Sequence, residues 1–348
     1  MNKILSVVVP TYNVKNYLDR CLLSLTADEH TLRDLDIIIV NDGSLDSSLE
    51  IAKRYEKKYS ESITVIDKEN GGHGSTINTG LKYAIGKYFR VLDSDDWVNT
   101  LDFKPFIKDL KKQEADAVLT NYTRELVYEG VAQHVEYKHL KYNKKYDLNT
   151  IDLNLFGDEY MYMHTLTIKT DILRAVNLSL DENTFYVDME YITLPLTKLD
   201  TFIYLDYDIY HYWIGRPDQS MNIVSMFKNR SHHERVLKRL AKLHTDEAHL
   251  NENKRAYLFN ILVLMLNTHY EIYMSRKLNS SELKEIRQFD KWLQNYNPSL
   301  YKAVAIKFPH IEPYRQTGFI FSSFLNKKFN RLSHIITSKK IHIMEENK

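Results

Sequence analysis

The chain has 348 residues, with 47 Lys and Arg against 46 Asp and Glu and a net charge of +1. This balance gives no reason to expect a nucleic-acid partner, and the length favours two domains, or one domain with an extension. The single cysteine, Cys21, excludes an internal disulfide and a cysteine zinc site, and it suits a reducing, cytoplasmic setting.

The first hundred residues alternate between predicted strands and helices. Apolar, β-branched runs predict strands at 5–9, 36–40, 63–66 and 88–92. Helices are expected between them, at 14–25, from 47 onward and around 77–85, with Cys21 on the buried side of the first. Asn13 is placed to cap the first helix, and Ser47 and Glu50 form a capping-box pattern for the second. This rhythm predicts an α/β fold with a mostly parallel sheet covered by helices on both faces.

The remaining chain divides into a mixed part and a helical part. Short helices (103–111 and 171–177) and strands (117–121 and 161–168) are expected between residues 101 and 221. Beyond them the stretches 222–245, 253–276 and 280–295 are typical of helices. We therefore predict an α/β domain over 1–221, with halves 1–100 and 101–221, and a mainly helical domain or appendage over 222–348.

Two apolar segments bear on location. The run 257–266 contains Asn260 and is too short to cross a bilayer. The tail 321–348 interleaves Lys and Arg with Phe, Leu and Ile, which is compatible either with an amphipathic segment on an anionic membrane or with a helix packed on the body. We favour the packed helix, and expect a cytoplasmic protein whose tail could touch the inner face of the membrane. The helical part could equally bind acceptor or a second copy of the chain.

Acidic residues follow two of the predicted strands, at the edge where ligands bind in parallel sheets. Asp93 and Asp95 are two apart, and two carboxylates at a strand end offer hard oxygen ligands to Mg²⁺ or Mn²⁺, normally completed by substrate phosphates. Asp42 follows the second strand and could accept hydrogen bonds from a base or ribose. The alternative for all three is a capping or turn-forming aspartate.

A glycine-rich loop, Gly71 to Gly74, leads into the third helix, where backbone amides favour anions. No Gly-Lys-Ser/Thr follows, so the loop is not a P-loop. No G-x-G-x-x-G follows the first strand, which disfavours a dinucleotide-binding fold.

The runs SVVVPTYN, VNDGSLDSS and NGGHGSTINTGLKYAIGKYFRVLDSDD resemble, in order and spacing, the nucleotide-binding half of glycosyltransferase family 2, which has the GT-A fold. The resemblance is strong over about the first 100 residues and weaker to about residue 220. It implies an inverting transferase that moves a sugar from a UDP-sugar to an acceptor hydroxyl with Mn²⁺ or Mg²⁺. It also implies a bacterial capsule or cell-wall polymer as acceptor, with 1–100 as the nucleotide-binding half and 101–221 as the acceptor half.

The resemblance also implies roles for individual residues. Asp42 would contact the base, and Asp93 and Asp95 would hold ribose and metal. The residues assigned to the nucleotide sugar are Pro10, Thr11, Tyr12, Asn13, Asp42, Gly72, His73, Asn78, Asp93, Ser94, Arg216 and Ser220.

Two later segments extend the resemblance. The run 185–190 resembles the segment that supplies the catalytic base, with Asp188 as the better candidate and Glu190 in reserve. A cap for the helix that follows is the alternative role for Asp188, and the two can coexist. The run 210–221 resembles a loop closing over the diphosphate, where Arg216 could neutralise charge and His211 could be a third metal ligand or a structural histidine.

Two rival functions share these features. A sugar-nucleotide nucleotidyltransferase would need a Gly-rich, Arg- or Lys-bearing loop after the first strand, which Pro10 to Asn13 does not provide. A non-enzymatic module that binds glycans or nucleotides is disfavoured by the intact acidic motifs. The sequence predicts a hexosyl- or N-acetylhexosaminyltransferase without identifying the donor sugar or the acceptor.

Overall fold

In the computed structural model the described residues are 3–126, 129–215, 222–248 and 250–320. They divide into two compact units. The sheet unit comprises the described residues of 1–126, 131–214 and 247–254, and the helical unit comprises those of 127–130, 215–246 and 255–348. The predicted domain boundary at 221/222 lies at the edge of a segment outside the described residues and stays a prediction.

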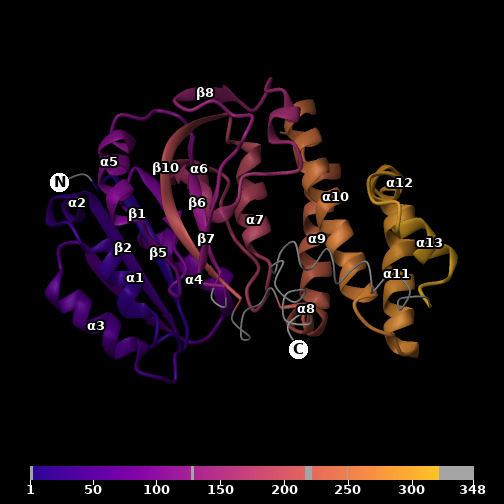
Figure 1. The fold of residues 1–348 in the computed structure, drawn as a ribbon, viewed down its shortest axis with the longest axis horizontal. Helices are drawn as coiled ribbons and strands as arrows, with labels where there is room; N and C mark the ends of the chain where they lie inside the picture. The colour runs from indigo at the N-terminus through magenta and orange to yellow at the C-terminus, as the bar shows by residue number, and fades with distance from the viewer. Residues whose placement is uncertain (1–2, 127–128, 216–221, 249, 321–348) are drawn as a thin grey trace, which may run out of the picture. The chain divides into compact units, whose positions relative to one another are not determined.

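One mixed sheet of ten strands organises the sheet unit. The strands are β1 (Leu5–Thr11), β2 (Leu35–Asp42), β3 (Ile63–Lys68), β4 (Tyr88–Val91), β5 (Trp97–Val98), β6 (Ala117–Leu126), β7 (Val131–Val135), β8 (Lys144–Asp147), β9 (Leu166–Lys169) and β10 (Thr201–Ile214). Their order is β3-β2-β1-β4-β9-β6-β10-β5, with β7 on β6 and β8 on β10 (Figure 1). The strands β1 to β4 are parallel, as are β6 and β10, and β9 joins the two groups by antiparallel pairing.

Helices cover both faces of the parallel strands. The helices of the sheet unit are α1 (Leu18–Leu25), α2 (Glu29–Asp34), α3 (Ser48–Lys58), α4 (Gly72–Tyr83), α5 (Thr100–Leu110), α6 (Thr170–Ala175) and α7 (Asp188–Thr193), with 3-10 turns η1 (Leu153–Phe156), η2 (Met163–Thr165) and η3 (Leu194–Thr197). Successive side chains of β1 point to opposite faces. Val7 and Val9 therefore join the core with α1 and α5, while Val8 meets α4. A Cβ on Gly80 would lie 2.4 Å from Val8 Cγ2, so glycine at this position allows α4 to approach the sheet.

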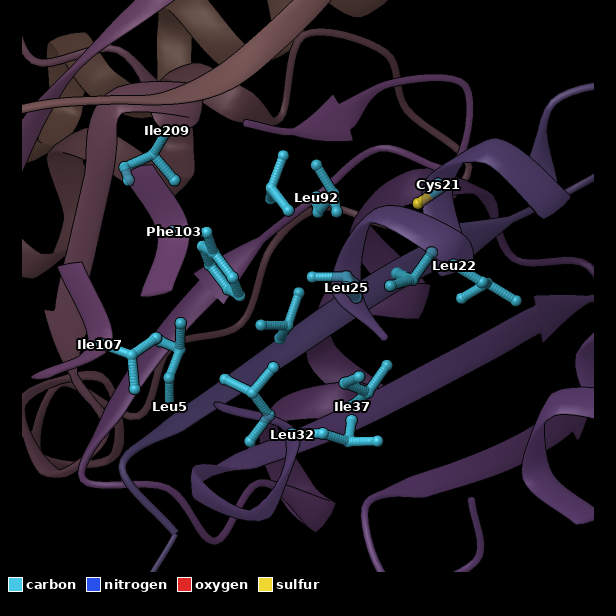
Figure 2. Packing of buried hydrophobic residues seen from close by; sticks show 14 of the residues in the cluster. Leu5, Cys21, Leu22, Leu25, Leu32, Ile37, Leu92, Phe103, Ile107 and Ile209 are labelled. Carbon is cyan, nitrogen blue, oxygen red and sulfur yellow. The ribbon is translucent and has the colours of Figure 1, made fainter. Parts of the chain in front are cut away.

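The main core lies between the sheet and the helices α1 and α5. Figure 2 shows it with sheet residues Leu5 and Ile37 against Cys21, Leu22, Leu25, Phe103 and Ile107 of the helices, all buried. Burying one such aliphatic side chain contributes about 1.5–3 kcal/mol. Burial also raises the pKa of the Cys21 thiol well above its ordinary value, so this cysteine is a packing residue, as predicted.

The helical unit confirms the helices predicted beyond residue 221. They are α8 (Ile223–Lys228), α9 (Arg230–Asp246), α10 (Glu252–Met274), α11 (Ser280–Tyr296), α12 (Pro298–Lys307) and α13 (Ile311–Gln316), and α12 and α13 were not predicted. The α10 start, residues 252–254, is counted with the sheet unit. Asn279 and Glu282 form a complete capping box at the start of α11, which satisfies amides that a helix end otherwise leaves unpaired.

Two buried polar groups lie inside the helical unit. Arg315 donates to Asp290 at 2.8 Å and lies 3.6 Å from the ring centre of Tyr301. His233 and His269 are both buried, with their Nδ1 atoms 3.2 Å apart and their rings stacked. Burial lowers the pKa of His233 to about 4, so the pair is neutral at neutral pH.

The predicted α/β sheet and helical C-terminal region are confirmed, but several local details were wrong. Asn13 does not cap α1, whose N-cap is Tyr17 without a side-chain bond, because the Asn13 side chain accepts from Leu45 instead. Ser47 makes no capping bond either, since Asp46 accepts from Ser48 N. Residues 210–214 belong to strand β10 and not to a loop.

No helix among the described residues is long and apolar enough to cross a membrane. The basic tail 321–348 lies outside the described residues, as do Arg216 and Ser220.

Candidate active site

The loops after β1 and β2 are bonded to each other. Asn13 N donates to Ser44 Oγ at 3.1 Å, and Asn13 Oδ1 accepts from Leu45 N at 2.7 Å. Asn13 has a positive φ of 52°, which asparagine tolerates better than most residues. Pro10 and Thr11 are buried at the end of β1, whereas Tyr12 is 47% exposed. Of these four residues, all assigned to the nucleotide sugar by the resemblance, Tyr12 and Asn13 are therefore the ones that reach the surface.

Asp42, predicted to contact a base, already accepts several hydrogen bonds from the protein. Its carboxylate accepts from Gly71 N at 2.9 Å, Gly72 N at 2.8 Å and Lys68 Nζ at 2.8 Å, and only 2% of the residue is exposed. It thus fixes the turn that opens α4, the turn-forming role weighed from sequence. A base contact would have to use the little acceptor capacity that these three bonds leave.

The start of α4 is locked to the segment 180–184. Gly72 has a φ of +82°, and its Cβ would lie 3.2 Å from the Asn183 backbone. A Cβ on Gly74 would lie 2.3 Å from Asp181 O. Close backbone approach therefore requires glycine at both positions, and the positive φ is a second reason at Gly72.

Asn78 completes this lock. Its Nδ2 donates to Leu180 O at 2.9 Å and its Oδ1 accepts from Leu180 N at 2.8 Å. Both polar groups of the amide are thereby used, so the structure gives Asn78 a different partner from the nucleotide sugar predicted from sequence. The geometry assigns it to holding the 180–184 segment, which leads directly to Asp188.

His73, Asp93 and Asp188 come together from three separate segments. His73 Nε2 lies 2.8 Å from Asp93 Oδ1. Burial alone lowers the pKa of His73, but Asp93, Asp188 and Asp95 outweigh it and raise that pKa above its ordinary value. Burial alone raises the pKa of Asp93, and His73 lowers it overall. His73 and Asp93 are thus an ion pair in which each partner holds the other charged.

Asp188 lies in the first turn of α7, close enough to His73 and Asp93 for each to act electrostatically on its carboxyl. Burial raises the pKa of Asp188, the nearby Asp93 carboxylate adds to the rise, and His73 and backbone hydrogen bonds only partly offset it. Two residues before Asp188, Tyr186 has a φ of +68°, an unfavourable conformation for an aromatic residue that surrounding contacts must hold in place. Glu190, the reserve candidate, is fully buried and accepts from Asp181 N at 2.7 Å. The geometry therefore favours Asp188 over Glu190 as the residue that can meet a substrate.

The acidic run after β4 holds a third carboxyl that the sequence did not single out. Asp96 is 1% exposed and accepts from Tyr210 Oη at 2.6 Å and from Trp213 N at 2.8 Å. Burial, with Asp95 and Asp93 close by, raises the pKa of Asp96 well above its ordinary value. Asp96 thus ties the acidic run to β10, while Asp93 and Asp95 are half-buried and Ser94 is buried between them.

His211 lies on the other face of β10. Successive residues of a strand alternate between faces. Tyr210 therefore turns toward Asp93 and Asp96, and His211 instead lies 2.7 Å from Glu125 and stacks on Trp97. Among the described residues no three His, Cys, Asp or Glu side chains are grouped so that they could hold a metal ion. The predicted trio of Asp93, Asp95 and His211 is therefore not assembled.

Comparison with known proteins identifies a family that matches the N-terminal part of the chain. Residues 6–166 match the family described as "Glycosyl transferase family 2". The segment 6–166 is therefore a glycosyltransferase family 2 domain. It is 35% identical over 157 residues to glycosyltransferase GlyA of Streptococcus pneumoniae serotype 4, covering 45% of this chain and 22% of that protein. It is 40% identical over 118 residues to the uncharacterized glycosyltransferase EpsJ of Bacillus subtilis, covering 34% and 33%. The chain thus spans a third or less of these two relatives.

The fold of the chain matches solved structures. TarS of S. aureus aligns with a TM-score of 0.68 at 20% identity, covering 95% of this chain and 92% of that chain. The mannosyltransferase PcManGT of Pyrobaculum calidifontis aligns with a TM-score of 0.52 at 15% identity, covering 94% and 87%. These likenesses bear on the fold alone, and they confirm the predicted GT-A architecture.

Proposed function

We propose that the chain is an inverting glycosyltransferase that moves a sugar from a UDP-sugar to a hydroxyl of a glycan or cell-surface polymer, with Asp188 as the base. The observation that carries the proposal is the convergence of Asp188 with the His73–Asp93 pair, three residues separated along the chain. A carboxylate beside an acidic strand end is what an inverting transfer requires on its acceptor side.

The proposed reaction is a direct displacement. Asp188 takes the proton of the acceptor hydroxyl, whose oxygen forms a bond to the anomeric carbon. The bond from that carbon to the diphosphate breaks at the same time, and its electron pair leaves with UDP. The anomeric configuration inverts because attack and departure occur on opposite faces. A raised pKa suits Asp188 to this task, since a base works best when its pKa approaches the working pH.

The end of β4 fits a divalent cation. Carboxylate oxygens two residues apart suit Mg²⁺ or Mn²⁺, which usually take only one or two protein carboxylates together with substrate phosphates. Asp93 already receives hydrogen bonds from His73 and Tyr210, which orient its carboxylate at this strand end. Bound there, the cation would neutralise charge on the departing diphosphate. His73, charged and paired with Asp93, offers a second positive group at the same edge.

Relatives guide the choice of substrates to test. One relative is a poly(ribitol-phosphate) beta-glucosyltransferase of Bacillus spizizenii, and TarS is a poly(ribitol-phosphate) beta-N-acetylglucosaminyltransferase solved with UDP-GlcNAc. PcManGT was solved with GDP-Man and Mn²⁺. We take UDP-GlcNAc and UDP-glucose as first donors and a polymer made on the inner side of the cell membrane as acceptor. A cytoplasmic site of action, with peripheral membrane contact, belongs to the same proposal.

A panel of nucleotide sugars with Mn²⁺ or Mg²⁺, scored by released nucleoside diphosphate with EDTA as control, tests the reaction. We expect release from one uridine sugar that EDTA abolishes. Asp188→Asn should reduce transfer by about 10²–10⁴-fold while UDP affinity stays unchanged, because a general base contributes that much. The matched control is Asp171→Asn, whose side chain is 95% exposed.

The outcomes separate the rival readings. Transfer by Asp188→Asn within a few-fold of wild type would refute the assignment of the base. Pyrophosphate release from a sugar phosphate and a nucleoside triphosphate would indicate a nucleotidyltransferase. Silence of the whole panel without thermal stabilisation by any nucleotide would leave the binding module as the better interpretation.

A further inference from the structure

One face of the β6–β10 ribbon carries a column of rings beside the candidate catalytic centre. Tyr212 pairs in register with Arg124, and Tyr210 pairs with Tyr122, so all four side chains leave the same face of the sheet. His164, from the turn before β9, completes the column. Its ring centre lies 4.2 Å from that of Tyr122 and 5.3 Å from those of Tyr162 and Tyr212. We call this set of residues the ring face: Tyr122, Arg124, Tyr162, His164 and Tyr212.

The ring face leads into the catalytic centre through Tyr212. The carboxylates of Asp96, Asp93, Asp95 and Asp188 all lie close enough to act electrostatically on the Tyr212 phenol. The hydroxyl of Tyr212 makes no hydrogen bond with any residue that the structure describes. A hydroxyl beside the proposed base that spends no bond on the protein is available to a substrate hydroxyl.

His164 offers a second polar atom of this kind. Its Nε2 is buried without a hydrogen-bond partner among the described residues. Its backbone oxygen accepts from Arg90, a buried arginine of β4 that also donates to Thr167. The histidine is thus anchored by its backbone while its imidazole stays uncommitted. Burial, with Arg90 and Arg124, lowers the pKa of His164 to about 3, so the ring is neutral and can both donate and accept.

Arg124 adds a charge at the outer end of the ring face. Its Nε and Nη2 donate to the Tyr122 hydroxyl at 3.0 and 2.7 Å, which fixes the plane of the guanidinium. Within the described part of the chain no carboxylate lies within 4.0 Å of it. The nearest acidic influence is Glu159, which is exposed and accepts from the Tyr162 hydroxyl. A half-buried guanidinium that has no ion pair and is held rigid is suited to a phosphate or carboxylate oxygen.

We propose that the ring face is the acceptor subsite, and that it takes a polyhydroxyl acceptor bearing an anionic group, phosphate or carboxylate, next to the hydroxyl that receives the sugar. The inference rests on the proposed function and deepens it. Rings provide the apolar wall, while Tyr212 and His164 bond the acceptor hydroxyls beside Asp188. Arg124 then pairs with the anion, an arrangement typical of sites in which a few polar groups fix the orientation of a ligand on an aromatic wall.

Binding without transfer tests this, with the whole chain saturated with UDP. Ribitol 5-phosphate and glucuronate are the anionic probes, and ribitol and glucose are their neutral counterparts, with affinities measured by saturation-transfer NMR. We expect one anionic probe to bind at least about tenfold tighter than its neutral counterpart, as a charged hydrogen bond would give. A preference confined to ribitol 5-phosphate indicates a phosphate-bearing acceptor, and one confined to glucuronate a uronate-bearing acceptor.

Variants distinguish Arg124 from general loss of structure. Arg124→Gln should abolish the anionic preference, Arg124→Lys should keep part of it, and Tyr212→Phe should weaken anionic and neutral probes alike. Arg33→Gln, at an exposed arginine of α2, is the matched control and should change nothing. UDP affinity should stay within about twofold of wild type in the Arg124 variants, since no donor contact is removed.

Equal affinity for charged and neutral probes, or a preference that survives Arg124→Gln in a folded variant, would overturn the inference. In both cases UDP binding and donor hydrolysis by the wild type would still support the proposed function. Absence of UDP binding in the wild type would instead remove the proposed function, and this inference with it.

Discussion

The family resemblance implies that Asn78 contacts the nucleotide sugar, whereas its hydrogen bonds hold the segment 180–184. Substitution of Asn78 distinguishes these two roles. Replacing it by Ala removes two hydrogen bonds, from Asn78 Nδ2 to Leu180 O and from Leu180 N to Asn78 Oδ1. Each is worth about 1 kcal/mol net, so the sheet unit should lose about 2 kcal/mol of unfolding free energy. For a unit of this size that corresponds to a fall in Tm of about 4–8 °C.

Loss of Asn78 should also lower activity, because its hydrogen bonds hold the segment 180–184. The segment 180–184 leads to Asp188, so loosening it should lower the transfer rate through misplacement of the base. Because both polar atoms of the amide already bond Leu180, the affinity for UDP should not change. Urea denaturation followed by circular dichroism, calorimetric titration with UDP and the transfer assay measure the three quantities. Lys82→Ala, an exposed site on the same helix, is the control.

The opposite pattern would refute this reasoning. If Asn78→Ala unfolds like wild type but binds UDP about tenfold more weakly, a loss of about 1.4 kcal/mol, then Asn78 contacts the nucleotide. The resemblance to the family would in that case have been the better guide.

Three further predictions rest on buried groups. Since burial raises the pKa of Asp188, transfer should be lost as pH falls through a value above the ordinary aspartate pKa of about 3.9, and a rate constant that stays flat down to that pH would contradict it. The pKa of His233, lowered by burial to about 4, lies below its value in the unfolded chain. The helical unit should therefore be fully stable above about pH 6.5 and lose up to about 3 kcal/mol as pH falls toward 4, followed by Trp292 fluorescence. The double variant His233→Gln/His269→Phe should lose that slope, whereas His30→Gln, at an exposed site, should keep it. Arg315→Ala removes the cation beside the Asp290 carboxylate, which is 15% exposed, and should cost about 3–5 kcal/mol in chemical denaturation; a cost below about 1 kcal/mol would show the pair to be dispensable.

The sequence predicted the elements whose signal is local. The strands β1 to β4 are short apolar runs, and the periodicity of such runs reports burial directly. Strand β10 was missed because its polar and aromatic residues break alternation, and its register with β6 shifts between Tyr204 and Tyr210. The two predicted caps were wrong for a similar reason. Asn13 and Ser47 are residue types that can cap a helix, but Asn13 accepts from Leu45 N, and Asp46 accepts from Ser48 N in place of Ser47.

Residues of the candidate site could be predicted where they lie within one continuous motif of the sequence. Asp93, Asp95 and Asp188 could be named because each lies in a recognisable run. Tyr210 and Asp96 are bonded across 114 positions, and Asn78 and Leu180 across 102, and no local pattern encodes such pairs. His164 had no signal either, since its surroundings are made by β6 and β10. Only the folded register brings these side chains together.

The close approach of Gly74 to Asp181 also constrains how relatives of this chain can diverge. With Cβ and a carbonyl oxygen 2.3 Å apart, any larger residue at position 74 forces the backbone at 181 to move. The segment that contains residue 181 leads to the proposed base, Asp188. A substitution at position 74, on the donor side of the site, would therefore also displace the base. Position 74 should therefore stay glycine in lineages that keep this backbone, and the geometry of the acceptor side would limit how the donor pocket can evolve.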